Sequence, residues 1–410
     1  MNFSVKALSK GGARAGVLQV GGCSMETPAL LLSTRKGLPA FISPDLLSTL
    51  PTPDSRLLQF SPLHFVEGIS LKVVSEMGGL HQMLGLKEHV FAANPADPIL
   101  SVPDHQSSNK IGASFETPSG RFLIKPGQYI EMISSMKPDM WVTLSDEVPA
   151  WVTDKRNKAS VQRTMRWLDD CLALDNTNDV CTKLTGGAVF GSIVGGSQIN
   201  ERIYCAQEVS RRNVSGVYGW LKIIFIKLLL LYYSGFHIGG FGLGESMDER
   251  PALLSAVTES LPEDKPRQIS GLGLPEEVLQ GVAAGIDLFN STYIYHLTIG
   301  GFALIFTSEE IERHGSVDQL SDTVRDDGTK INLKATIYRL LFWSQDFLSN
   351  LTVFDICCMM KRLVDEWVQF AIPSSTGKTR DDVGEVFLFF VEHPAQDSLL
   401  LAMQHTTCYR

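Results

Sequence analysis

Residues 267–290, which read RQISGLGLPEEVLQGVAAGIDLFN, decide the fold class of this 410-residue chain. The run 268–272 predicts a buried strand that ends among glycines. Pro275 then favours the first turn of a helix, because its missing N–H would have no partner there in any case. Gly285 predicts the end of that helix, and residues 286–289 predict a second strand that leads to Asn290. The stretch is therefore one βαβ unit, whose two strands end at the same face of a parallel sheet.

The same alternation recurs along the chain before this unit. Strands are predicted at 140–144, 188–194 and 236–238, and each precedes a predicted helix, at 157–174, 200–212 and 248–261. Further strands are predicted at 27–32, 57–65, 98–102 and 111–115, and further helices at 73–84 and 126–136. Such alternation indicates a parallel sheet, and polar or glycine residues at the strand ends favour its closure. We therefore expect an α/β fold, a (β/α)8 TIM barrel with insertions, rather than an open doubly wound sheet.

The overall charge limits the nucleic-acid surfaces that this chain can offer. With a net charge of −9, it is not expected to carry a strongly basic groove of its own. One basic run is present, and we interpret it as a solvated helix face: Lys155, Arg156, Lys158, Arg163 and Arg166. Seven scattered cysteines favour free thiols in a reducing compartment. The N-terminal residues lack the continuous apolar run of a secretory signal.

Five stretches near the predicted strand ends resemble the tRNA-guanine transglycosylase family. They are residues 72–81, 144–147, 193–196, 238–245 and 270–275. The resemblance covers residues 1–339 and implies a barrel domain over that range. Residues 112–120, 141–151 and 166–171 are more similar still to the non-catalytic, accessory members of the family. The family exchanges guanine in tRNA for queuine.

The resemblance implies where the chemistry of the family would lie. One carboxylate attacks ribose C1′ and holds the sugar covalently, and a second carboxylate transfers a proton. The nucleophile position is occupied by Asn290, and the general-base position by Val102, although Asp104 lies close by. A base-reading glutamine is replaced by Val194. These three losses at three strand ends predict that the chain has no catalytic residues.

A remnant of the base pocket is nevertheless expected. Asp146, which in catalytic members contacts the base, is present, and with it we predict a remnant pocket formed by Val194, Gly195, Gly239 and Gly240. The alternative is that Asp146 merely caps the helix or loop after its strand. The glycines either let the backbone approach a flat ligand or allow tight packing. The sequence leaves both pairs of alternatives open.

Two segments depart from the family. Residues 217–235 are an apparent insert, for which a retained intron is one explanation, and residues 340–410 are a divergent C-terminal tail. The insert is not expected to span a membrane, because its apolar run is interrupted by lysines and is shorter than the ~20 residues required. The tail stands where the family has a zinc subdomain with three Cys ligands and one His. Cys357 and Cys358 with His393 or His405 are a poor substitute, so no zinc site is predicted in this chain.

The predicted function is that of a non-catalytic, accessory subunit. By resemblance, it would pair as a heterodimer with a catalytic queuine tRNA-ribosyltransferase subunit and meet tRNA through that complex. The resemblance implies a cytoplasmic location, with peripheral association with the mitochondrial outer membrane as a second location. Two alternatives stay open. One is a catalytic enzyme that uses Asp287 or Asp104 as a displaced carboxylate, and the other is a splice isoform unable to assemble.

Overall fold

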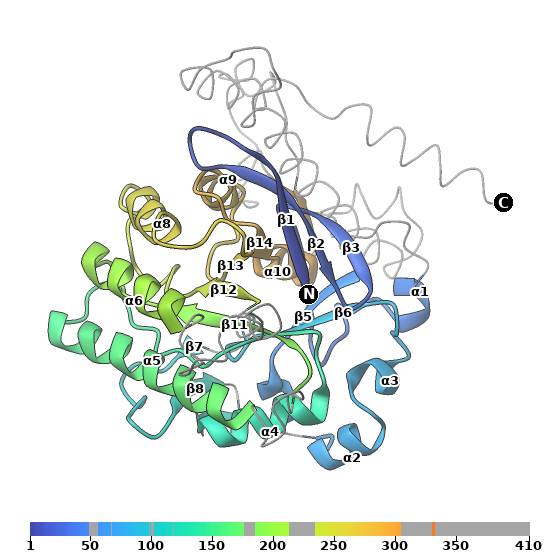
Figure 1. The fold of residues 1–410 in the computed structure, drawn as a ribbon. Coiled ribbons are helices and arrows are strands. Elements are labelled where there is room, and N and C mark those ends of the chain that lie inside the picture. The colour runs from blue at the N-terminus through green and yellow to red at the C-terminus, as the bar shows by residue number, and fades with distance from the viewer. Residues whose placement is uncertain are drawn as a thin grey trace, which may run out of the picture.

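Eight parallel strands close into a barrel in the computed structural model (Figure 1). The model describes residues 1–48, 56–66, 68–97, 99, 102–117, 119–175, 185–212, 234–304 and 330–332. Strands follow one another around the barrel in chain order, and the last pairs with the first. They are β4 (Ala29–Ser33), β5 (Leu57–Phe60), β6 (Val90–Ala93), β10 (Met140–Val142), β11 (Ala188–Ile193), β12 (Gly235–Ile238), β13 (Arg267–Ile269) and β14 (Leu288–Asn290). The predicted TIM barrel is confirmed.

Helices surround the barrel on its outer side (Figure 1). Helix α4 has the bounds that the sequence predicts, whereas the helix predicted at 73–84 is two short helices. The break falls at Gly78 and Gly79, which have φ values of 93° and 106° that a helix does not allow. The helices are α1 (Pro44–Ser48), α2 (Leu71–Glu76), α3 (Leu80–Leu84), α4 (Pro126–Met136), α5 (Asp154–Asp175), α6 (Ile199–Arg212), α8 (Arg250–Thr258), α9 (Pro275–Ala283) and α10 (Thr292–Gly300), with a 3-10 turn, η2 (Pro62–Phe65).

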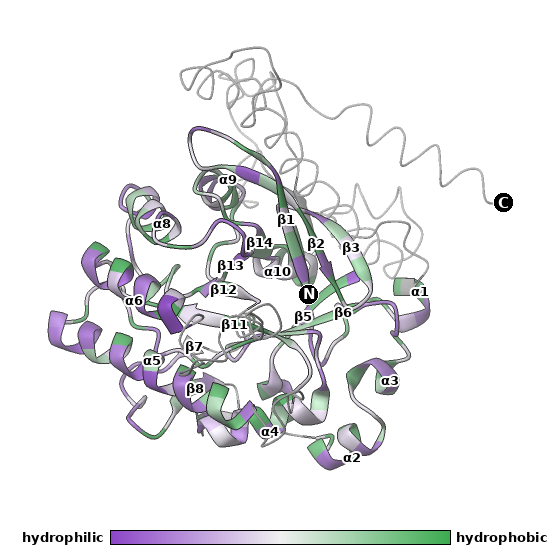
Figure 2. Ribbon diagram, in the orientation of Figure 1, coloured by the Kyte–Doolittle hydropathy of each residue, from purple (hydrophilic) through white to green (hydrophobic). Residues whose placement is uncertain are grey.

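Alternation along the strands divides the apolar core into two clusters. Leu58, Phe91 and Trp141 pack with helix residues in the larger cluster, between the barrel and its helices. Their strand neighbours Leu57 and Val90 belong to a second cluster formed by inward-facing strand residues. Figure 2 shows that the outer helices α5 and α6 carry both hydrophilic and hydrophobic residues, as helices with one buried face do.

A three-stranded antiparallel sheet, not predicted from the sequence, covers the N-terminal end of the barrel. It consists of β1 (Asn2–Leu8), β2 (Arg14–Val20) and β3 (Cys23–Thr27). Leu18 and Met25 from this sheet join the second apolar cluster, together with residues from the starts of the barrel strands. Apolar side chains of this sheet therefore pack against the starts of the barrel strands, opposite the carboxyl ends.

A second antiparallel sheet follows β6 on the carboxyl side of the barrel. Its strands are β7 (Val102–Pro103), β8 (Ala113–Thr117) and β9 (Gly120–Ile124), and β8 and β9 pair antiparallel up to Thr117 opposite Gly120. Of the strand predicted at 98–102, Val102 lies in β7 and Ile99 lies in a turn, and the other three residues lie outside the described ones. Strand β6 itself was not predicted. A further pair, β15 (Phe302–Leu304) and β16 (Lys330–Asn332), is antiparallel.

The two departures from the family lie mostly outside the residues that the structure describes. Of the apparent insert, only residues 234 and 235 are described, and of the tail 340–410 none is. Cys357, Cys358, His393 and His405, which the sequence analysis judged a poor zinc site, lie outside the described residues. Within the described ranges, no helix combines the length and apolar character needed to cross a membrane. The same ranges contain no cluster of three or more His, Cys, Asp or Glu side chains suited to a metal ion.

Candidate functional site at the barrel mouth

Asn290 is the last residue of β14, and it lies at the carboxyl end of the barrel with 2% of its surface exposed. This is the end at which TIM-barrel enzymes place their catalytic side chains. The side-chain amide nitrogen of Asn290 has no hydrogen-bond partner among the described residues. A carboxamide is neutral at all physiological pH values, so it brings no negative charge to this position.

Asp287 lies at the opposite end of the same strand. Its backbone carbonyl accepts a hydrogen bond from the N–H of Ala29, where β4 starts. Its carboxylate accepts from Arg14 Nε at 2.9 Å and from the backbone N–H of Arg267 at 2.6 Å. Burial raises the pKa of Asp287, and attraction to Arg14 opposes that rise. Asp287 is therefore the partner of a buried arginine under the N-terminal sheet. The alternative that it serves as the nucleophile is wrong, because Asp287 lies at the end of the barrel opposite Asn290.

Asp104, the other carboxylate considered as a substitute, is held in a turn after β7. One of its oxygens accepts from the backbone N–H groups of Gln106 and Ser107, both at 3.2 Å, and Arg121 Nε donates to the other at 2.6 Å. Burial alone would raise its pKa, but the hydrogen bonds from Ser107 and the charge of Arg121 lower the pKa of Asp104. A carboxylate held in this way is a weak base. Val102 begins β7, opposite Glu116 of β8.

Asp146 lies in the loop after β10 and is almost completely buried, with 1% exposed. Two arginines from α5 bind its carboxylate. Arg156 donates from both terminal nitrogens, at 2.9 and 2.8 Å, and Arg163 Nη1 donates at 3.0 Å. The predicted basic helix face is therefore only partly correct, since Lys155, Lys158 and Arg166 are exposed but these two arginines turn inward. The carboxylate binds side chains of α5 and does not cap a helix terminus.

The same arginines fasten the loop after β7 over Asp146. Arg156 Nη2 donates to the backbone carbonyl of His105 at 2.7 Å, and Arg163 Nη1 donates to that of Ser108 at 2.8 Å. The backbone N–H of Asp146 is bound by Thr164 Oγ1 at 3.0 Å. Both carboxylate oxygens and the backbone N–H of Asp146 are consequently paired with other parts of the chain.

The predicted pocket glycines contact buried charged side chains. Arg202 of α6 donates to the carbonyls of Gly196, Gly239 and Gly240 at 2.6, 3.2 and 3.0 Å. Its guanidinium also lies 4.0 Å from the ring centre of Phe241. Burial lowers the pKa of Arg202 to about 10, which leaves it protonated at neutral pH.

Tight packing leaves no room for a side chain at two of these glycines. A Cβ atom at Gly195 would lie 2.6 Å from Cγ of Arg202, and one at Gly239 would lie 2.8 Å from Oε1 of Glu147. Glu147 accepts hydrogen bonds from the backbone N–H of Gly240 at 3.0 Å and from Ser145 Oγ at 3.1 Å. Burial raises the pKa of Glu147. The glycines thus admit side chains of the protein itself, as in the second of the two readings that the sequence leaves open.

Beneath the mouth, the inward-facing positions are polar but uncharged. Ser270 Oγ lies 2.9 Å from Asn94 Nδ2 and 2.9 Å from His237 Nε2. Burial lowers the pKa of His237 to about 3, so its imidazole is neutral. Further buried polar atoms in the same region have no hydrogen-bond partner among the described residues. They belong to the side chains of Ser33, Gln59, His237, Gln268 and Asn290. These groups can donate or accept hydrogen bonds, but none of them is an anionic nucleophile.

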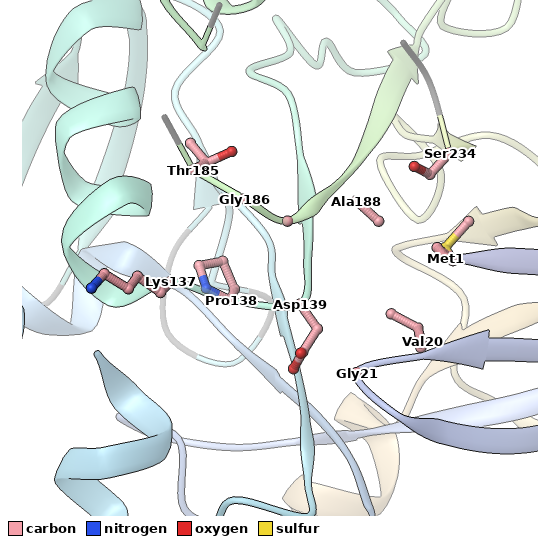
Figure 3. A pocket seen from close by; sticks show the side chains of 11 residues that line it. Met1, Val20, Gly21, Lys137, Pro138, Asp139, Thr185, Gly186, Ala188 and Ser234 are labelled. Carbon is pink, nitrogen blue, oxygen red and sulfur yellow. The ribbon is translucent and has the colours of Figure 1, made fainter. Parts of the chain in front are cut away.

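A cavity of about 630 Å³ lies at the other end of the barrel (Figure 3). Its walls come from the β2–β3 turn at Gly21 and from the segments that lead into β10 and β11, including Asp139 and Gly187. His81 Nε2 lies 2.9 Å from the Asp139 carboxylate. Because this cavity lies beside the strand starts, it is separate from the mouth.

Comparison with known proteins decides the family. Residues 9–345 match the family model described as queuine tRNA-ribosyltransferase. The chain belongs to the queuine tRNA-ribosyltransferase family. It is 33% identical to a Xenopus tropicalis protein over 75% of this chain and 69% of that one. It is 30% identical to a Gallus gallus protein over 72% of this chain and 64% of that one. It is also 30% identical to a Homo sapiens protein, over 72% of this chain and 67% of the human one. Each of these relatives is named queuine tRNA-ribosyltransferase accessory subunit 2.

The queuine tRNA-ribosyltransferase barrel brings together some of the predicted residues and separates others. Asp146, Gly195, Gly239 and Gly240 are linked through the contacts of α5 and α6 at the mouth, whereas Asp287 is remote. Val194 is buried with 1% exposed. Sequence reasoning missed Glu147 and Arg202. Glu147 follows Asp146 directly and could have been suspected, but only the fold shows that α6 directs Arg202 onto two glycine loops.

Proposed function

We propose that this chain is a non-catalytic, accessory subunit that pairs with a catalytic queuine tRNA-ribosyltransferase subunit and supports the exchange of guanine by queuine in tRNA. The observation that carries the proposal is Asn290 at the carboxyl end of β14, where its neutral carboxamide lies among buried, uncharged polar side chains such as Gln268 and His237. The accessory role is also the one that the names of its relatives state.

The chemistry of the exchange supports this proposal. Covalent capture of ribose at C1′ needs an anionic oxygen, and a carboxamide oxygen is a far weaker nucleophile. The carboxylates near the mouth are engaged elsewhere. Asp146 is bound by two arginines, Asp104 by Arg121 and two backbone N–H groups, and Glu147 by Ser145 and Gly240.

The proposal includes the partners and location expected from the family. A cytoplasmic heterodimer would meet tRNA through its combined surface, with peripheral association with the mitochondrial outer membrane as a second location. On this chain, Trp151 is 73% exposed and lies three residues before the start of α5, which carries exposed Lys155, Lys158 and Arg166. An aromatic side chain beside basic ones can stack on a base while the charges hold phosphates. This part of the mouth is therefore the first place to look for tRNA contacts.

Reconstitution tests the proposed function. The chain is co-expressed with a tagged catalytic relative, and the incorporation of labelled guanine into tRNA is measured for each protein alone and for the mixture. We expect the chain to co-purify with the catalytic subunit, to raise exchange by the mixture, and to give no exchange alone. Turnover by the chain alone would contradict the proposal and favour the displaced-carboxylate enzyme. Failure to co-purify would favour the isoform that cannot assemble. Elemental analysis of this chain purified alone tests the prediction that residues 340–410 hold no zinc.

A further inference from the structure

The inward-facing side chains of the barrel change from apolar to polar partway along its length. Near the N-terminal sheet they are apolar, and Leu57, Met140 and Leu288 are among them. Nearer the carboxyl ends of the strands, the pairing places Ser33 beside Gln59 and His237 beside Gln268. The half of the interior that lies toward the mouth is therefore lined mainly by uncharged polar side chains.

The strand register arranges these polar residues in three successive layers. In a barrel of this kind, neighbouring strands are offset by about one residue, and alternate strands contribute the four side chains of a layer. The deepest of the three layers holds Gln268 with three apolar residues, and the next holds Gln59, His237 and Asn290 with one. The outermost layer is polar throughout and consists of Ser33, Asn94, Ser192 and Ser270.

Seven buried polar atoms in these layers have no hydrogen-bond partner among the described residues. Four of them are the amide nitrogens and oxygens of Gln59 and Gln268. The others are Ser33 Oγ, His237 Nδ1 and Asn290 Nδ2. Each of these five residues is at most 3% exposed. Because buried polar groups in folded proteins are nearly always hydrogen-bonded, either to protein or to ordered water, these atoms indicate a bound partner that supplies several hydrogen bonds.

The chemistry of these atoms selects a neutral partner that both donates and accepts hydrogen bonds. A side-chain amide offers N–H donors and a carbonyl acceptor, and a hydroxyl group does both. The three layers offer no charge to an ion, because burial lowers the pKa of His237 to about 3 and keeps its imidazole neutral. Water meets these requirements. A buried water molecule makes about three hydrogen bonds, so the seven atoms correspond to roughly two or three molecules.

We propose that the half of the barrel interior toward the mouth is a hydration site, which holds a cluster of ordered water molecules between Gln268 and Asn290. Asn94, Ser270 and His237 are already linked by direct hydrogen bonds at 2.9 Å. The cluster therefore lies on the other side of the interior, toward β14, β4 and β5, where it joins side chains that do not reach one another. This inference goes beyond the accessory role and holds whether or not the chain pairs with a catalytic subunit.

Magnetic relaxation dispersion of water tests the proposal on the full chain, because it counts the water molecules that stay inside a protein for long periods. Gln268→Met keeps the length of the side chain and removes both polar atoms, so we expect it to lose about one such molecule. Gln59→Met/Gln268→Met should lose more. Gln162→Met is the matched control, because this glutamine is exposed on α5, and it should keep the count of the unchanged protein. Folded interior variants that keep that count would overturn the inference.

A measurement on the unchanged protein guards against a variant that does not fold. Circular dichroism identifies any such variant, and a high-resolution crystal structure of the full chain then decides the question alone. It should show ordered water within hydrogen-bonding distance of the Gln59 and Gln268 amides. Amides that bond directly to neighbouring side chains, with no water between them, would overturn the inference. Neither result would affect the co-purification and exchange measurements that test the accessory role.

Discussion

Asn290 and Asp287 lie three residues apart along the chain, yet they belong to opposite ends of the barrel. Asn290 ends β14 at the mouth, and Asp287 precedes β14 and binds Arg14 under the N-terminal sheet. Three residues of a strand span roughly 10 Å. The acidic side chain nearest in sequence to the expected nucleophile position therefore cannot reach the mouth, and proximity along the chain is misleading here.

Replacing Asn290 with Asp should destabilise the protein without making it an enzyme. The new carboxylate would lie among neutral, buried side chains, so its pKa in the folded state would be raised. The loss of unfolding free energy should therefore be present at pH 7 and disappear as the pH falls below the unfolded-state pKa of the aspartate, about 4. We expect a fall of about 1–3 kcal/mol in the free energy of unfolding at pH 7. Urea unfolding at pH 7 and pH 4 measures it, with Asn290→Ser as the uncharged control, and an equal loss at both pH values would contradict the explanation.

Replacing Asp287 with Asn should be more damaging, because it leaves Arg14 buried without a counter-charge. Arg14 and Asp287 are both buried, and we expect a loss of about 3–5 kcal/mol. The double variant Arg14→Met/Asp287→Leu should recover much of that loss, because neither charge is then buried alone. Denaturant unfolding of the single and double variants gives the comparison. A single-variant loss below about 1 kcal/mol would place Asp287 outside the structural role assigned here.

Replacing Arg202 with Lys should destabilise the mouth. An ammonium group cannot reach all three carbonyls that the guanidinium binds or lie flat on Phe241. We expect a loss of about 2–4 kcal/mol in unfolding free energy, from unsatisfied buried carbonyls. Arg211→Ala on the same helix is the control, because its side chain is 71% exposed and should cost less than about 0.5 kcal/mol. Similar losses for both variants would contradict the assignment.

The His81–Asp139 pair at the other end of the barrel should make stability depend on pH. Burial alone would lower the pKa of His81, but the hydrogen bond and charge of Asp139 raise it above its ordinary value. A raised histidine pKa stabilises the fold fully below the unfolded-state value, about 6.5, and the gain is lost as the pH rises through the folded-state pKa. His81→Gln should therefore cost more at pH 6 than at pH 8.5, by less than about 1 kcal/mol after screening. Thermal unfolding at both pH values tests the sign.

The fold could be predicted because its helices carry clear periodic patterns and its turns carry glycine or proline. Helix α4 begins at Pro126, and α9 begins at Pro275, as the sequence indicates. Strand β6 was missed because its four residues are buried on both faces, so no alternation marks them. The N-terminal sheet was missed although Phe3, Val5 and Ala7 alternate with polar residues along β1, and Cys23 and Met25 do so along β3.

The sequence predicted which residues form the candidate site, but it did not predict which side chains they bind. Asn290 and Asp146 were identified from motifs, and both lie on the carboxyl side of the barrel. That Arg156 and Arg163 turn onto Asp146 depends on how α5 packs beside β10, which a helical pattern cannot reveal. For the same reason the run that contains them was interpreted as a solvated face.

The most direct test of the accessory role asks which subunit captures tRNA covalently. Labelled tRNA is incubated with the mixed complex, and the products are separated on a denaturing gel that resolves the two subunits. We predict label on the catalytic subunit alone, and none on this chain even when the nucleophile of its partner has been removed. Label that stays on this chain under denaturing conditions would contradict the account, because it would require a reactive carboxylate at a mouth where we find Asn290.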